Sequence, residues 1–167
     1  RIEELIEDLL TLARVGDRAV NVETVSLAKT VERAWQSVET AEAAVVVDTT
    51  RTLEADRSLL QQLLENLVEN AVEHGGSDVT VTVGDVSDGF YVADDGTGIP
   101  TAEREDVFTS GYSTSHRGTG FGLSIVERVV EVHGWACRAT ESDAGGARFE
   151  ITGVEDPSRE SAGYRSD

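Results

Sequence analysis

The sequence is poor in several residue types, and each shortage excludes a class of protein. Its 167 residues include one cysteine, Cys137, so a disulfide within the chain is excluded and a reducing compartment is expected. Lysine occurs once, at Lys29, and 14 basic residues face 32 acidic ones, for a formal net charge of -18. Because proteins bind nucleic acids largely by neutralising phosphates with basic side chains, no nucleic-acid partner is expected.

Long apolar runs and a secretory signal are also missing. No apolar segment approaches the roughly 20 residues that a membrane-spanning helix requires, and the first residues lack the pattern of a signal peptide. We therefore expect a soluble, cytoplasmic chain, which leaves membrane association of a longer parent protein open. The length fits one domain with short extensions.

The acidic residues are spread along the chain instead of forming a tail, and small Val and Ala dominate the apolar set. At high ionic strength the repulsion among such charges is screened, while the charge keeps the protein soluble. This composition is typical of a protein adapted to high salt, as in a halophilic archaeon. An ordinary acidic mesophilic protein is the alternative.

Hydrophobic periodicity predicts a series of helices. The first covers Arg1–Arg14 and is either the end of a longer helix or a short helix packed on its own domain. Others are expected from a Ser26 cap to about Ala41, from an Asp56 cap to His74, and over Phe121–His133.

The sequence also predicts short strands between and after these helices. They cover Ala44–Asp48, Thr52–Ala55, Asp78–Gly84, Gly89–Ala93, Trp135–Ser142 and Ala147–Thr152. A polar turn joins the first two, and the last two form a hairpin across 143–146. The order of elements predicts an α/β two-layer sandwich, in which helices cover one face of a mixed, largely antiparallel sheet.

An apolar strand pattern, Phe90–Ala93, runs directly into the segment Asp94-Asp95-Gly96-Thr97-Gly98. Glycine allows positive φ and close approach of the backbone to a ligand, and an Asp at the end of a strand offers a fixed hydrogen-bond acceptor. Taken alone, the segment fits both a ligand-binding turn and an acidic surface turn.

The helix that begins at Asp56 carries a broad apolar arc, with Asn70 projecting within it and Asn66 one turn back at its edge. A buried amide without partners costs roughly 1–3 kcal/mol, so Asn70 requires a ligand or a polar partner. Its oxygen is suited to Mg²⁺, which takes few protein ligands beside water and phosphates. An Asn bonded to neighbouring backbone is the alternative.

These segments, together with a glycine repeat, resemble the N, G1 and G2 boxes of the sensor histidine kinase ATP-binding domain. The boxes are Glu65–His74, Asp94–Pro100 and Gly118–Leu123, and Phe108 falls where the family has its F box. The resemblance covers nearly the whole chain, and four ordered boxes are more specific than one Gly-rich loop. The resemblance implies the Bergerat fold shared with gyrases, heat-shock chaperones and mismatch-repair ATPases.

The resemblance also implies roles for individual residues. Asn70 would bind Mg²⁺, Asp94 would accept a hydrogen bond from the adenine amino group of ATP, and Arg117 is the basic candidate for the γ-phosphate. His74 would lie beside the nucleotide, although an ordinary last residue of a helix is the alternative. The expected nucleotide contacts are Asn70, His74, Asp94, Gly96, Gly98, Ile99, Phe108, Ser113, Thr114, Gly118, Thr119, Gly120, Gly122 and Leu123, and the expected catalytic residues are Asn66 and Arg117.

Glu73 departs from the family pattern, because many relatives carry a Lys or Arg there that reaches phosphate. A carboxylate cannot contact phosphate without Mg²⁺ between them. Recognition of phosphate by this helix alone is therefore not expected.

The function that the resemblance implies is a protein histidine kinase, which transfers the γ-phosphoryl group of Mg-ATP to a histidine outside this chain. Residues 1–16 would end the dimerisation and phosphotransfer hairpin, 17–154 would form the ATP-binding catalytic domain, and 155–167 a disordered tail. The implied partners are ATP, the phosphoacceptor hairpin and a response regulator. A homodimer is implied for the full-length protein, with a monomeric fragment left open. The alternatives are a Bergerat-fold protein serine kinase and a nucleotide-gated ATPase or interaction module.

Overall fold

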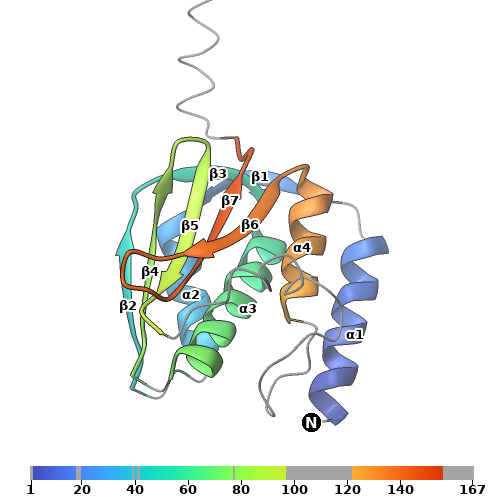
Figure 1. Ribbon diagram of the computed structural model, residues 1–167. Coiled ribbons are helices and arrows are strands. Elements are labelled where there is room, and N and C mark those ends of the chain that lie inside the picture. The colour runs from blue at the N-terminus through green and yellow to red at the C-terminus, as the bar shows by residue number, and fades with distance from the viewer. Residues whose placement is uncertain are drawn as a thin grey trace, which may run out of the picture.

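The computed structural model describes residues 2–17, 20–38, 40, 42–76, 78–96 and 122–155. Its helices are α1 (Ile2–Asp17), α2 (Leu27–Ser37), α3 (Arg57–Gly75) and α4 (Gly122–His133). Its strands are β1 (Val22–Ser26), β2 (Ala44–Asp48), β3 (Thr52–Asp56), β4 (Thr80–Val86), β5 (Gly89–Asp94), β6 (Ala136–Glu141) and β7 (Ala147–Thr152). Sheet and helices form two layers (Figure 1).

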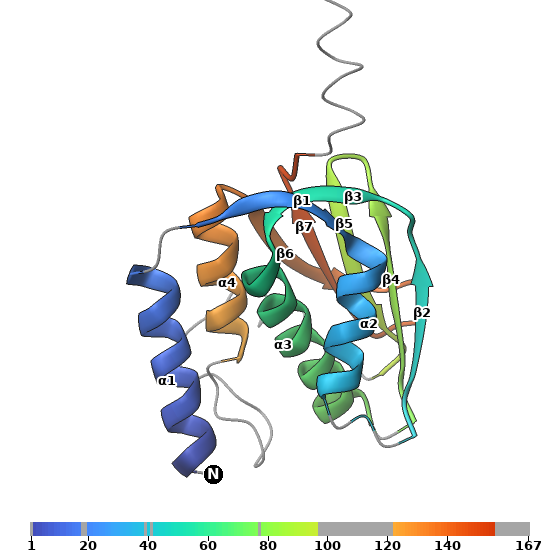
Figure 2. The same ribbon diagram turned by 180° about the vertical axis from the view of Figure 1, so that it is seen from behind.

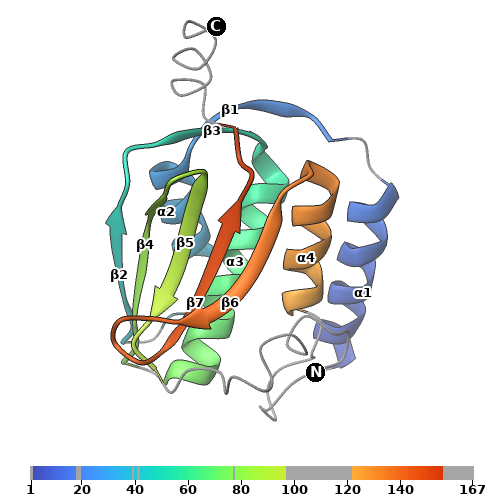
Figure 3. The same cartoon turned by 45° about the horizontal axis from the view of Figure 1, so that its top comes forward.

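The larger sheet has five strands in the order β2-β4-β5-β7-β6, and the helices lie on one of its faces (Figure 3). β2 pairs with β4 in parallel, whereas the other pairs in this sheet are antiparallel. The predicted sandwich with a mixed, largely antiparallel sheet is therefore confirmed. None of the described helices is long and apolar enough to cross a membrane.

The first half of the chain differs from expectation in two places. β2 and β3 lie in different sheets, because β3 pairs with β1, a strand that the sequence analysis missed. The turn between β2 and β3 is anchored on the β4–β5 hairpin, where Thr49 Oγ1 donates to Asp85 Oδ1 (2.6 Å) and Arg51 donates to two carbonyls. α2 ends at Ser37, earlier than expected, because the backbone of Val38 is extended (φ -105°, ψ 143°).

The hydrophobic core fills the space between the inner face of the large sheet and the helices. Its largest fully buried side chains include Leu27, Leu53, Leu60, Leu63, Leu64, Leu67, Phe90, Ile125 and Ile151. α3 supplies many of these because it packs against both α2 and α4 (Figure 2). Burying each such side chain contributes roughly 1.5–3 kcal/mol. Cys137 packs against this core, and burial raises the pKa of its thiol to about 12, so the thiol stays protonated and unreactive.

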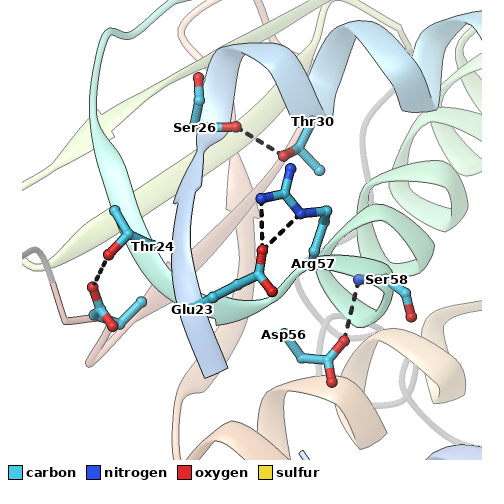
Figure 4. A network of polar contacts seen from close by, with 8 residues as sticks. Glu23, Thr24, Ser26, Thr30, Asp56, Arg57 and Ser58 are labelled. Carbon is cyan, nitrogen blue, oxygen red and sulfur yellow. Dashed lines mark hydrogen bonds and ion pairs between the residues drawn. The ribbon is translucent and has the colours of Figure 1, made fainter. Parts of the chain in front are cut away.

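Asp56 caps the start of α3 (Figure 4). Its Oδ1 accepts hydrogen bonds from the N–H groups of Ser58 and Leu59, both at 3.1 Å, and its Oδ2 accepts one from Asn21 (2.9 Å). The residue is 1% exposed, so these donors replace the water that the carboxylate loses on burial. The predicted cap is confirmed, and it also fixes the chain just before β1.

His133, in the last turn of α4, joins the same junction. Its Nε2 accepts a hydrogen bond from the N–H of Asp56 (3.0 Å), so Nδ1 carries the proton that is donated to the carbonyl of Val129 (2.8 Å). The ring stacks on Trp135, with the centroids 4.1 Å apart. Burial lowers the pKa of His133, which favours the neutral ring that these contacts require. The end of α4 is thereby held against the start of α3, and the two helices run antiparallel.

α1 lies along α4 on the edge of the helical layer (Figure 1, Figure 2). Leu12 packs towards the core, whereas Ile6, Leu9 and Leu10 are exposed. The amphipathic pattern of this helix therefore covers α4 with one face and leaves large apolar side chains on another.

Candidate functional site

Segments that are far apart in the sequence meet at one end of the molecule. Because α3 and α4 are antiparallel, the last turn of α3 lies at the same end as the first turn of α4 (Figure 3). β5 ends there in Asp94, and the turn between β6 and β7 lies beside it. This end therefore gathers the expected N box, the first part of the G1 box and the start of α4.

Asp94 is the best defined acceptor at this end. The residue is 9% exposed, and its Oδ1 accepts hydrogen bonds from the N–H groups of Gly96 (2.9 Å) and Ala147 (3.1 Å). Burial raises the pKa of Asp94, while these two N–H groups oppose the shift; nearby Asp95 raises the pKa further and His74 lowers it. Among the described residues none donates to Oδ2, so Oδ2 is the acceptor that this carboxylate offers to a ligand.

The turn after Asp94 rests directly on the end of α3. A Cβ on Gly96 would clash with the Cα of Gly75, so only glycine permits this contact between backbones. The next carboxylate, Asp95, reaches back to the sheet, where its Oδ1 accepts the N–H of Thr80 (2.8 Å). The distance between α3 and the end of β5 is therefore set by backbone contact.

Asn66 and Asn70 lie one turn apart on α3, and their burial is the reverse of the expected order. Asn66 is 5% exposed, and its Nδ2 donates to the carbonyl of Gln62 (2.7 Å). Asn70 is only partly buried, and no described residue hydrogen-bonds to its amide. The prediction that Asn70 projects deeper into the apolar arc than Asn66 was wrong, because α2 and α4 cover α3 on both sides. Bonding to neighbouring backbone, the alternative raised for Asn70, occurs at Asn66.

His74 and Glu73 follow in the last turns of α3. His74 lies close enough to Asp94 to lower the pKa of that carboxyl, so the structure brings together these two expected contacts. Oε1 of Glu73 is buried and has no hydrogen-bond partner among the described residues. Because a buried carboxylate oxygen without a partner costs free energy, this position suits a contact with a cation or donor.

The turn between β6 and β7 also contacts Asp94, a role that the sequence analysis missed. Ser142 is 7% exposed, and its hydroxyl donates to the main-chain carbonyl of Asp94 (2.7 Å). The two residues are 48 positions apart, so local patterns carry no signal of their contact. The one signal in the sequence was the second glycine of Gly145-Gly146, because a glycine next to a strand often marks a close approach of two backbones.

Several expected contacts lie outside the described residues, namely Gly98, Ile99, Phe108, Ser113, Thr114, Arg117, Gly118, Thr119 and Gly120. Gly122 is the first residue of α4, and Leu123 is 9% exposed and packs in the core. Within the described ranges, no three His, Cys, Asp or Glu side chains are grouped to hold a metal ion.

A known protein family matches the part of the chain that contains most of its helices and strands. The family described as "Histidine kinase-, DNA gyrase B-, and HSP90-like ATPase" matches residues 55–155. This range contains α3, β5, α4 and the β6–β7 turn, and therefore every described residue that hydrogen-bonds to Asp94.

Two similar proteins are histidine kinases. Sensor histidine kinase ZraS of Klebsiella oxytoca is 32% identical over 161 residues, which cover 89% of this chain and 34% of that protein. Signal transduction histidine-protein kinase AfsQ2 of Streptomyces coelicolor is 33% identical over 174 residues, covering 95% of this chain and 31% of that protein. The chain thus spans about a third of the length of these relatives.

Solved structures of the same kind share the fold. The mycobacterial sensor histidine kinase MprB superposes with a TM-score of 0.69 at 27% identity, over 80% of this chain and 97% of the other. Full-length ShkA in complex with AMPPNP gives a TM-score of 0.71 at 26% identity, over 92% of this chain and 36% of the other. The chain therefore belongs to the histidine kinase-, DNA gyrase B- and HSP90-like ATPases.

Proposed function

We propose that this chain binds Mg-ATP and transfers the γ-phosphoryl group to a histidine on another segment, the phosphoacceptor hairpin of the full-length protein. The observation that carries the proposal is the buried Asp94 carboxylate, which two backbone N–H groups hold through Oδ1 at the end of the molecule that contains the last turn of α3 and the first turn of α4. The similar structure of ShkA was solved with AMPPNP, which supports a nucleotide as ligand.

Asp94 recognises adenine in this proposal. With Oδ1 engaged by Gly96 and Ala147, Oδ2 accepts a hydrogen bond from the exocyclic amino group. An ionised carboxylate only accepts, so a base with an oxygen at the same position finds no donor. His74, in the last turn of α3, is a further proposed contact to the nucleotide.

Asn70 holds Mg²⁺ in this proposal. Its partly buried amide oxygen is a hard ligand, and Mg²⁺ binds proteins through few such oxygens while keeping water and phosphate ligands. Glu73 lies three residues later, on the same side of the helix, and its buried Oε1 adds a second oxygen without a described donor. The residues present therefore fit the ion, whose chemistry is to neutralise charge on the phosphates.

The remaining roles follow the resemblance. Arg117 and the backbone N–H groups over 118–122 contact the phosphates at the start of α4, where the helix dipole favours an anion. Asn66 stays a catalytic candidate through its amide oxygen, because its bond to Gln62 uses the nitrogen. Ile99, Phe108, Ser113, Thr114 and Leu123 complete the proposed nucleotide contacts.

The proposed context is a two-component system. Residues 1–16 end the phosphoacceptor hairpin, 17–154 form the catalytic domain, and 155–167 are a tail. The full-length protein is a homodimer that passes phosphate to a response regulator, and this domain works in the cytoplasm, where ATP and Mg²⁺ are available.

The adenine contact is tested with Asp94→Asn. Loss of a hydrogen bond to a charged acceptor costs roughly 1.5–3 kcal/mol, so we expect ATP affinity, measured by titration calorimetry, to fall at least about tenfold. Asp143→Asn removes a charge at the exposed tip of the β6–β7 turn and serves as the matched control. Unchanged ATP affinity in folded Asp94→Asn would contradict the assignment.

The metal contact is tested with Asn70→Ala. We expect affinity for Mg-ATP to fall by about tenfold or more, whereas affinity for adenosine, which carries no phosphate, changes little. Gln36→Ala, an exposed amide on α2, is the control. If Asn70→Ala binds Mg-ATP as tightly as the unmodified chain, Asn70 has a purely structural role.

The acceptor is tested by phosphorylation. His133 lies at the far end of α4, about 18 Å along the helix from its start, and its Nε2 is engaged by Asp56. His74 lies in the last turn of α3, on the same helix as Asn70, and His116 is outside the described residues. In-line transfer needs a nitrogen opposite the leaving oxygen, so we expect no acid-labile label from γ-labelled ATP on this chain alone.

A separate hairpin that carries the upstream histidine is expected to become labelled when it is added. The same hairpin with alanine in place of the histidine is the control. Acid-labile label on this chain alone would refute transfer in trans.

We also propose adaptation to high salt, from the net charge of -18 with one lysine. Screening is nearly complete at about 1 M salt, where the Debye length is about 3 Å, so a further gain in stability above that concentration reflects solvation of the acidic surface. We expect the melting temperature to rise from about 0.2 M to about 2 M KCl. Replacing the exposed carboxylates of Glu32, Glu42 and Asp143 by amides should flatten this rise, and a flat curve for the unmodified chain would count against the proposal.

A further inference from the structure

The turn between β6 and β7 folds over Asp94 and holds it from the side opposite α3. Ser142, the residue after β6, donates its hydroxyl proton to the main-chain carbonyl of Asp94 (2.7 Å). At the other side of the turn, the N–H of Ala147 donates to Oδ1 of the same residue (3.1 Å). One turn therefore restrains both the backbone and the carboxylate of Asp94.

Ser142 also organises the turn itself. Its Oγ accepts the N–H of Gly146 (2.9 Å), and its own N–H donates to the carbonyl of Gly146 (2.8 Å). The N–H of Gly145 donates to the carbonyl of Ser142 (2.9 Å) and closes the turn. The hydroxyl of Ser142 thus links Gly146, the residue just before Ala147, to the main chain of Asp94.

Gly146 lets the turn approach closely. A Cβ at this position would clash with the main-chain oxygen and with Oδ1 of Asp94. Both Ser142 and Gly146 are buried, whereas Asp143, Ala144 and Gly145 at the tip are exposed. The buried side of the turn is therefore fitted to Asp94, and its tip is free of that constraint.

We propose that Ser142 is a positioning residue that sets adenine specificity by fixing the orientation of the Asp94 carboxylate, an inference that rests on the proposed function. With the hydroxyl in place, Ala147 stays on Oδ1, and Oδ2 is aimed at the base. Without it, the turn loses its link to the Asp94 carbonyl, and Oδ1 keeps only the N–H of Gly96. The carboxylate then rotates, and its bond to an amino group weakens.

A change of the nucleobase distinguishes a role of Ser142 in positioning Asp94 from a general loss of protein stability. Inosine triphosphate carries an oxygen where ATP carries the amino group, and the two ligands share ribose and phosphates. A variant that is only destabilised loses affinity for both nucleotides in parallel. A variant with a misplaced Asp94 loses affinity for ATP alone, so the ratio of the two affinities reports the position of the carboxylate.

The experiment measures the dissociation constants of ATP and inosine triphosphate in the presence of Mg²⁺. It compares the unmodified chain with Ser142→Ala and Ser142→Cys, and Ala144→Ser at the exposed tip of the turn is the control. We expect the unmodified chain and Ala144→Ser to prefer ATP by at least about tenfold. Ser142→Ala should lose most of that preference while affinity for inosine triphosphate changes by less than about twofold. Ser142→Cys, which has the same shape with a slightly larger atom and supplies a weak donor, should lie between them.

The outcomes are separable. If the unmodified chain does not prefer ATP, the adenine role of Asp94 fails, and the proposed function fails with it. If the unmodified chain prefers ATP and the Ser142 variants keep the same ratio, the inference about Ser142 is overturned while the proposed function stands. If Ser142→Ala does not fold, as judged by thermal melting, the ratio for Ser142→Cys decides the question in the same way.

Discussion

Burial of the Asp94 carboxylate is the constraint on which the geometry of the site depends. A carboxylate loses hydration when it is buried, which raises its pKa, and backbone N–H groups have to replace the lost water. These groups come from the turn after β5 and from the start of β7. Each approach passes through a glycine where a Cβ would clash, Gly96 against α3 and Gly146 against Asp94 itself. The backbone around the site is thus arranged so that its N–H groups reach the Asp94 carboxylate.

The two ends of α3 differ in whether their polar groups have hydrogen-bond partners within the protein. At the start, both oxygens of Asp56 accept backbone N–H groups and His133 closes the junction, so this network is complete within the protein. At the other end, described residues supply no donor to Oδ2 of Asp94, to the amide of Asn70 or to Oε1 of Glu73. A complete polar network fixes structure, whereas acceptors left at one end of a helix are suited to a ligand. The antiparallel α3 and α4 keep these two functions apart.

The sequence predicted what is encoded locally and missed what depends on distant contacts. The Asp56 cap, the main strands and the layered fold follow from periodicity and capping, which act over a few residues. The prediction of which asparagine, Asn66 or Asn70, is more buried was wrong. Their burial depends on how α2 and α4 cover α3, which periodicity does not specify. The contact of Ser142 with Asp94 joins residues 48 positions apart, so no single segment of sequence contains it.

Electrostatics decides how such an acidic chain can hold a polyanionic nucleotide. No lysine or arginine occurs between Arg57 and Arg104, so the α3 and β5 side of the site contributes carboxylates but neither of these cationic side chains. In the proposed function this side therefore takes the base, with Asp94 as the hydrogen-bond acceptor. In the same proposal the phosphates need positive charge from elsewhere, which Mg²⁺ held by Asn70 and the N–H groups at the start of α4 would supply, because the helix dipole there favours an anion. Glu73 strengthens this division, because a carboxylate in the last turns of α3 repels phosphate unless a cation lies between them.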